Sequence, residues 1–144
     1  MQSDWRGVML SIRPRYAEAI IRGDKTIELR RTRIHATAGT LVVLYSSSPT
    51  RSVLGTAVLD EIIEAQPAEL WPRVKDEAGV TQVEFDRYFE NAARGYGLRL
   101  RDAVALATPT PLHSIRANAG LEPPQSFRYV TRSQADLLTT ALAS

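Results

Sequence analysis

The stretch VMLSIRPRYAEAIIRGDKTIELRR, residues 8–31, predicts one strand–helix–strand unit. Its first residues, 8–12, are mostly apolar, which is typical of a buried strand, and Pro14 then suits the first turn of a helix. Apolar residues recur at helical spacing as far as Gly23, and a glycine supplies the left-handed conformation that commonly ends a helix. A second strand is expected over residues 26–30.

This second strand alternates polar and apolar side chains. Ile27 and Leu29 are expected on the core side, and the polar residues on the other side. The polar side consists of Thr26, Glu28 and Arg30, and Lys25 directly precedes the strand. A cation, a carboxylate and a guanidinium within six residues indicate a binding or reactive site. The alternative is a surface row of ion pairs, each of which contributes only about 0–1 kcal/mol.

The rest of the chain predicts more strands than helices. Strands are expected at 41–45, 53–63, 96–100 and 104–107, the last two either separate or one bent strand, and helices at 67–78, 81–93 and 133–142. Residues 112–115 are expected to extend the sheet, and residues 121–129 to begin as an ordered loop. Because strands and helices do not alternate regularly, we expect an α+β domain built on a small, mostly antiparallel barrel with peripheral helices.

Several local signals refine these elements. Gly55 marks a bulge or a close backbone approach within its strand. Thr81 and Glu84 have the spacing of a capping box, and Ser133 is expected to cap the last helix. In the helix at 81–93, the residues expected to share an apolar face are Val83, Phe85, Tyr88 and Phe89.

Length and composition restrict the class of protein. A chain of 144 residues with 44% hydrophobic residues predicts one globular domain, residues 1–144. It has no cysteine, so thiolate metal sites are excluded, and we expect no metal or other cofactor. His35 and His113 lack the neighbours of a catalytic triad and are expected to be structural or exposed. No apolar stretch is long enough for a membrane helix, which predicts a cytoplasmic protein without a membrane partner.

The charge is concentrated at the N-terminal end. Residues 1–51 contain nine basic against four acidic residues, whereas residues 52–144 contain nine against twelve. Of the 18 basic residues all but Lys25 and Lys75 are arginines, which bind phosphate through two parallel hydrogen bonds and stack on bases. This pattern favours an anionic partner, although a GC-rich genome would also replace lysine by arginine.

The octet Gly23-x-Lys25-x-x-Glu28-x-Arg30 resembles the G-x-K-x-x-E-x-R signature of ASCH domains, which are barrel-like relatives of the PUA RNA-binding domain. Blocks at 10–14, 44–49 and 123–127 resemble the bacterial and archaeal branch of PUA-like predicted regulators, so the resemblance spans most of residues 8–130. It implies a PUA-like barrel with a cleft beside the signature strand. Members use this cleft for RNA binding, for ribonucleolytic cleavage or for hydrolysis of an acylated cytidine.

We expect a cleft that binds RNA or a nucleotide. Its candidate ligand-binding residues are Arg13, Arg15, Lys25, Thr26, Glu28, Arg30, Tyr45, Ser46, Ser47, Ser48, Gln125 and Ser126. Cationic side chains would meet phosphate, a carboxylate would accept from an amine or a ribose hydroxyl, and Tyr45 or Tyr129 would offer a stacking face. The serines are equally consistent with a turn that binds nothing, and Gln125 and Ser126 with residues that fix a loop.

Three activities fit this site. Binding of RNA or a nucleotide ranks first, because Glu28 and an open cleft would keep Lys25 in its charged form. A ribonuclease that cleaves single-stranded RNA ranks second, with Lys25, Glu28 and Arg30 as its reactive groups and with a divalent metal as an optional requirement. An amidohydrolase for a modified nucleoside ranks third, because the resemblance implies a hydroxyl residue where this chain has Glu28, unless Thr26 substitutes. Hydrolysis by water that Glu28 activates, with Lys25 stabilising the developing negative charge, stays open.

DNA binding is less expected than RNA binding, because no helix-turn-helix is evident and the helices at 67–78 and 81–93 carry an acidic excess. The sequence does not define an oligomeric state.

Overall fold

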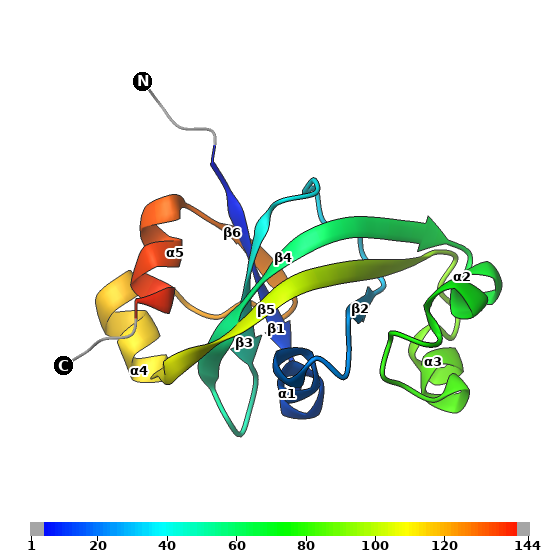
Figure 1. Cartoon of the computed structure of the whole chain (residues 1–144), viewed down its shortest axis with the longest axis horizontal. Coiled ribbons are helices and arrows are strands. Elements are labelled where there is room, and N and C mark those ends of the chain that lie inside the picture. The colour runs from blue at the N-terminus through cyan, green and yellow to red at the C-terminus, as the bar shows by residue number, and fades with distance from the viewer. Residues whose placement is uncertain (1–4, 141–144) are drawn as a thin grey trace.

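The computed structural model describes residues 5–140, which form an α+β fold around one six-stranded sheet (Figure 1). The strands are β1 (Gly7–Ile12), β2 (Ile27–Arg30), β3 (Leu41–Ser46), β4 (Ser52–Ala65), β5 (Gly95–Pro111) and β6 (Phe127–Val130). Their order is β2-β5-β4-β3-β1-β6, and every pairing is antiparallel except that of β1 with β3. The sheet is therefore mixed and curls into a half-barrel, which corrects the expected barrel.

The helices lie at the two ends and on one side of this sheet. They are α1 (Pro14–Arg22), α2 (Pro67–Val74), α3 (Gln82–Tyr88), α4 (Leu112–Ser114), the π-helical turn η1 (Ile115–Ala119) and α5 (Arg132–Thr139). In Figure 1 the long strands β4 and β5 cross the molecule, with α2 and α3 at one end and α4 and α5 at the other. No helix within residues 5–140 is long and apolar enough to cross a membrane.

The unit over residues 8–31 folds as its sequence predicts. Pro14 begins α1, and Gly23 ends it with a φ of 87° while its N–H donates to the carbonyls of Ala19 and Ile20. Strand β2 begins at Ile27, one residue later than expected, because the N–H groups of residues 26 and 27 both donate to the carbonyl of Glu77. All four residues of β2 are buried, so both faces of this strand are covered.

The open side of the half-barrel, between β2 and β6, is bridged by the segment that follows β2. The backbone N–H of His35 donates to the Tyr129 hydroxyl of β6 at 2.9 Å, and Arg6 donates to the carbonyl of His35 at 2.6 Å. The His35 side chain is exposed, and its backbone joins the two ends of the sheet.

Two predictions about the second half of the chain are corrected, and part of a third lies outside the described residues. Residues 112–115 leave the sheet and become helical, in α4 and the first residue of η1. The last helix is capped by Thr131, whose capping box with Gln134 begins the helix two residues before Ser133. Residues 141 and 142, the predicted end of this helix, lie outside the described residues.

Other boundaries differ less. The two segments at 96–100 and 104–107 belong to one strand, β5, and the end of the predicted loop 121–129 pairs with β1 as β6. Helices α2 and α3 are shorter than predicted, and the predicted capping box of Thr81 and Glu84 is present.

Gly55 lies at an irregular point of the sheet, as its position in the sequence predicts. The registers of β4 with β3 and with β5 both shift beside it. A Cβ atom at Gly55 would come within 2.1 Å of the Val104 carbonyl oxygen and 2.7 Å of Ile21 Cδ1. The backbones of β4 and β5 therefore approach each other more closely than any side chain permits.

Replacement of this glycine tests the close approach. We expect Gly55→Ala to lower the free energy of unfolding by about 2 kcal/mol or more, because overpacking forces the backbone apart. Urea unfolding followed by circular dichroism measures the change. Thr56→Ala, at the next and half-buried position, is the control and should cost less than about 1 kcal/mol. Equal effects of the two substitutions would contradict the prediction.

Candidate functional site

A cleft of about 730 Å³ lies beside β2, between the start of α1, helix α3 and the loop that precedes β6. The predicted site residues that line it are Arg13, Lys25, Glu28, Arg30, Ser47, Gln125 and Ser126. They come from segments up to 113 positions apart and share one cavity. The structure thus brings together the signature residues and the later blocks that the sequence singles out.

Lys25 lies at the floor of the cleft and is only 2% exposed. Its Nζ donates to the Ala78 carbonyl at 2.5 Å and lies 3.5 Å from Glu28 Oε1. Gly79 allows the chain to pass beside the lysine stem, since a Cβ there would lie 3.2 Å from Lys25 Cβ. The α2–α3 connection therefore holds the ammonium in place.

Burial lowers the pKa of Lys25, and the neighbouring Glu28 opposes this shift only in part. The expectation that Glu28 and an open cleft would favour the charged form is therefore wrong for the direction of the pKa shift of Lys25, although its ammonium still pairs with Glu28. The cleft is open, but the ammonium lies beneath its surface, where loss of hydration disfavours the charged form. Lys25 gives up its proton more readily than an exposed lysine.

Glu28 stands between two cations. Its Oε2 accepts from Arg30 Nη2 at 2.9 Å, and its Oε1 faces Lys25 at 3.5 Å. The side chains of Glu28 and Arg30 are 9% and 8% exposed. A buried carboxylate needs such partners, because an isolated charge in a low-dielectric interior is costly. Oε1, at the longer distance, is the oxygen more available to a ligand.

The Arg30 guanidinium joins parts of the chain that are far apart in the sequence. Its Nη1 donates to the carbonyl and hydroxyl oxygens of Ser126, at 3.1 and 3.2 Å, and its Nη2 donates to the Ser11 carbonyl at 3.0 Å. Both terminal nitrogens are thus committed to protein acceptors. Its Nε is buried and has no hydrogen-bond partner within the described residues.

The structure places the other predicted site residues outside this cleft. They are Arg15, Thr26, Tyr45, Ser46 and Ser48. Arg15 forms an exposed ion pair with Glu84 at 2.8 Å, and the Thr26 hydroxyl donates to Glu77 at 3.0 Å. Tyr45 is 5% exposed and packs in the core cluster around Met9 and Val43.

The three consecutive serines, residues 46–48, differ in burial. Ser46 is fully buried, and its hydroxyl has no hydrogen-bond partner within residues 5–140. Ser48 is exposed, whereas Ser47 lines the cleft. The serine-rich loop therefore contributes one residue to the cavity wall.

Two tyrosines of the cleft were not among the predicted site residues. Tyr16 of α1 and Tyr88 of α3 both line the cavity. The helical pattern assigned Tyr88 to an apolar face that includes Val83, but Val83 is 66% exposed and Tyr88 is 36% exposed. The sequence signal that could have indicated Tyr88 is its place at the end of a short helix. A tyrosine there can cover apolar surface with its ring while its hydroxyl contacts polar groups.

Three exposed arginines, Arg13, Arg31 and Arg87, also line the cleft. None of them forms an ion pair with a carboxylate in the described part of the chain, in contrast to Arg15 and Arg33. The cleft therefore has a buried, internally paired floor and a cationic rim. Within residues 5–140, no group of three or more His, Asp or Glu side chains is arranged to hold a metal ion.

The buried contacts of Arg30 predict a large effect on stability. We expect Arg30→Met to lower the free energy of unfolding by about 3 kcal/mol, because it leaves buried acceptors and part of the Glu28 charge without a partner. Arg33→Met removes an exposed ion pair with Glu64 and should cost less than about 1 kcal/mol. Urea unfolding of both variants measures the difference. Similar losses in the two would show that Arg30 contributes no more than a surface residue.

Glu84 predicts a pH dependence of stability. The Thr81 backbone N–H and the Arg15 guanidinium lower its pKa from 4.5 to about 2. Folding favours the ionised form of Glu84. Its contribution to the free energy of unfolding is therefore fully present above pH 4.5 and is lost as the pH falls through about 2.

Glu84→Gln keeps the capping geometry, as Gln134 does in α5, but removes the charge. We expect the Tm of the wild type to fall more steeply than that of Glu84→Gln between pH 4.5 and 2, as measured by thermal circular dichroism. Parallel pH profiles would contradict this.

Comparison with known proteins agrees with the fold and with the family resemblance. The model of the ASCH domain matches residues 10–101. An ASCH domain-containing ribonuclease of Zymomonas mobilis is 30% identical over 139 residues, which cover 95% of this chain and 93% of that protein. The crystal structure of ASCH from Zymomonas mobilis superposes with a TM-score of 0.87 at 28% identity, over 94% of each chain.

A more distant structure shares the fold alone. The N-terminal domain of Staphylothermus marinus McrB superposes with a TM-score of 0.59 at 11% identity, over 93% of each chain. The family model and the Zymomonas relative confirm the resemblance first indicated by the octet at residues 23–30, and the chain belongs to the ASCH domain family.

Proposed function

We propose that this protein binds single-stranded RNA in the cleft beside β2 and cleaves it there. The observation that carries the proposal is the position of Lys25 and Glu28, side by side at the floor of a cavity with unpaired arginines on its rim. The Zymomonas relative is an ASCH domain-containing ribonuclease, and the alignment covers 93% of its length, which supports the same activity for this chain.

Binding is assigned to the rim. Arg13 and Arg87 are exposed, form no ion pair in the described residues and line the cavity, so their guanidinium groups are available to phosphates. Arg30 is assigned a positioning role, because its terminal nitrogens already donate to Ser126, Ser11 and Glu28.

The chemistry is assigned to the floor. Attack of a ribose 2′-oxygen on the adjacent phosphorus breaks the bond to the 5′-oxygen and leaves a 2′,3′-cyclic phosphate. Glu28 Oε1 would accept the proton of the 2′-hydroxyl, and the charged Lys25 would stabilise the negative charge that develops on the phosphoryl oxygens. The 5′-oxygen takes up a proton as it leaves, either from Lys25 or from water.

Hydrolysis of a modified nucleoside through a hydroxyl nucleophile is not proposed. This route would require a hydroxyl group close to Lys25, and Thr26 was the candidate for this role. The Thr26 hydroxyl donates to Glu77 and lies in a second hollow of about 280 Å³, outside the main cleft.

Substitutions at the floor should separate cleavage from binding. We expect Glu28→Gln and Lys25→Met to reduce cleavage of a labelled single-stranded RNA by about 100-fold or more while binding persists. Assays with EDTA and with added Mg²⁺ define any metal requirement, and the matching DNA strand should remain uncut because it lacks the 2′-hydroxyl. If both variants cleave and bind like the wild type, the floor is not the reactive site.

Substitutions at the rim should affect binding. We expect Arg13→Ala and Arg87→Ala each to weaken RNA binding and to reduce the dependence of log K on log salt by about one. Arg73→Ala is the matched control, because Arg73 is an exposed arginine of α2 that does not line the cleft. Fluorescence anisotropy at several salt concentrations measures both quantities. An equal loss for Arg73→Ala would point to nonspecific attraction.

A further inference from the structure

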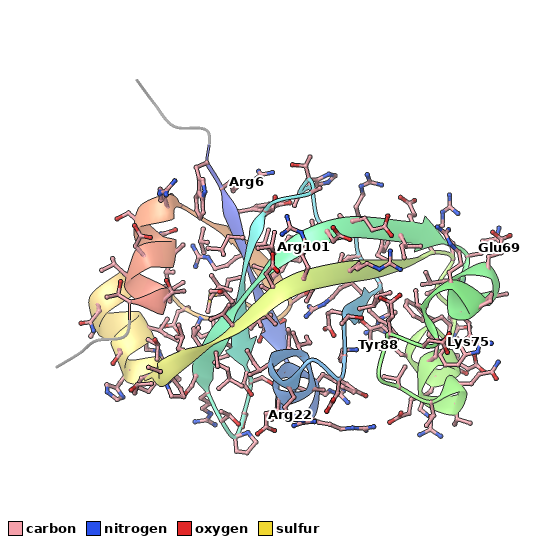
Figure 2. All side chains as sticks on the ribbon, viewed as in Figure 1. Arg6, Arg22, Glu69, Lys75, Tyr88 and Arg101 are labelled. Atoms are coloured by element: carbon pink, nitrogen blue, oxygen red, sulfur yellow. The ribbon has the colours of Figure 1, made fainter. Side chains whose placement is uncertain are left out.

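Tyr88 is held in a fixed position at the end of α3, facing β2 (Figure 2). Its hydroxyl donates to the Leu29 carbonyl at 3.2 Å. Its ring meets that of Phe89 edge-on, with the centroids 4.8 Å apart and the planes at 76°. The side chain is nevertheless 36% exposed and lines the cleft. A tethered ring with a free surface in a polar cleft is pre-organised for contact with a ligand.

Arg31 lies over this ring. Its guanidinium carbon is 4.9 Å from the ring centroid, and the residue directly follows β2 on the exposed side of the cleft wall. No carboxylate within residues 5–140 forms an ion pair with Arg31, although carboxylates partner many other arginines of this chain. Its planar group is thus held by an aromatic ring at the mouth of the cleft.

The other tyrosines near the site are less exposed than Tyr88, which is 36% exposed although Arg31 lies over its ring. Tyr129 has Arg6 3.9 Å from its ring centroid, and its hydroxyl accepts from the His35 N–H. The Tyr16 ring is contacted by Lys25 Nζ at 4.9 Å and by Arg15 at 5.2 Å. Tyr45, the other stacking candidate from the sequence, is buried outside the cleft.

We infer that Tyr88 and Arg31 form a stacking site for one unpaired RNA base, and that this site makes the cleft select single strands over duplexes. The inference rests on the proposed function. Every base has a planar face that stacks on aromatic rings and on guanidinium groups. In a duplex these faces are covered by neighbouring bases, so only a single strand can offer one. The rim arginines can bind the phosphates of a single strand and of a duplex alike.

The test compares two substitutions at Tyr88. Tyr88→Leu removes the ring, whereas Tyr88→Phe keeps the ring and removes only the hydroxyl. Binding is measured by anisotropy with a 2′-O-methyl single strand, which cleavage through a 2′-hydroxyl leaves intact, and with a duplex of the same sequence. We expect Tyr88→Leu to weaken single-strand binding about tenfold without changing duplex binding. Tyr88→Phe should bind both within about threefold of the wild type.

A scan with single abasic sites tests the same idea on the wild-type protein, so that it does not depend on the folding of a variant. One position in the strand should lose about tenfold in affinity when its base is removed, and Tyr88→Leu should no longer distinguish that position.

The outcomes are separable. Binding of RNA by the wild type with no sensitive abasic position, or equal losses for single strand and duplex in Tyr88→Leu, would overturn the stacking site and leave the proposed function standing. A wild type that binds no RNA would overturn the proposed function and this inference with it.

Discussion

The hydrogen bonds of the Arg30 guanidinium are the interaction on which the site depends. Strands β2 and β6 are the two ends of the sheet order, and no pairing joins them within the described residues. Arg30 reaches across this opening to Ser126, next to β6, and to Ser11 on β1. A buried guanidinium requires hydrogen-bond acceptors and a counter-charge, and Glu28 supplies the counter-charge of Arg30. One side chain thus closes the curled sheet and shapes the cleft floor.

Burial connects this closure to chemistry. Glu28 is held by Arg30 and in turn faces Lys25, whose other partner is the Ala78 carbonyl between α2 and α3. The helical pair at one end of the molecule therefore contributes a contact that keeps the lysine in place and out of water. The same loss of hydration lowers the pKa of Lys25. A lysine on the surface would have neither the fixed position nor the lowered pKa.

Much of the fold could be predicted where the backbone properties of a single proline or glycine determine the local structure. Pro14 and Gly23 define the limits of α1, and Gly55 marks the irregular register of β4. The parallel pairing of β1 with β3 could not be predicted, because strand order depends on contacts between distant segments. Residues 112–115 have an apolar pattern too short to distinguish a strand from a helix, and they are helical.

The candidate site shows the same division. The signature and all three blocks, 10–14, 44–49 and 123–127, contain residues that share one cavity, but the sequence could not say which side chains point inward. Arg30 and Arg31 are adjacent and chemically identical, yet one is buried with both terminal nitrogens committed to the protein and the other is exposed over Tyr88. Arg30 ends β2 and Arg31 follows it, and both line the cleft; only the packing of α3 and of the loop before β6 gives each side chain its environment. Arg30, which belongs to the signature, therefore holds the site together through its hydrogen bonds to the protein. Arg31, its neighbour without an ion pair in the described residues, is the one available to a ligand.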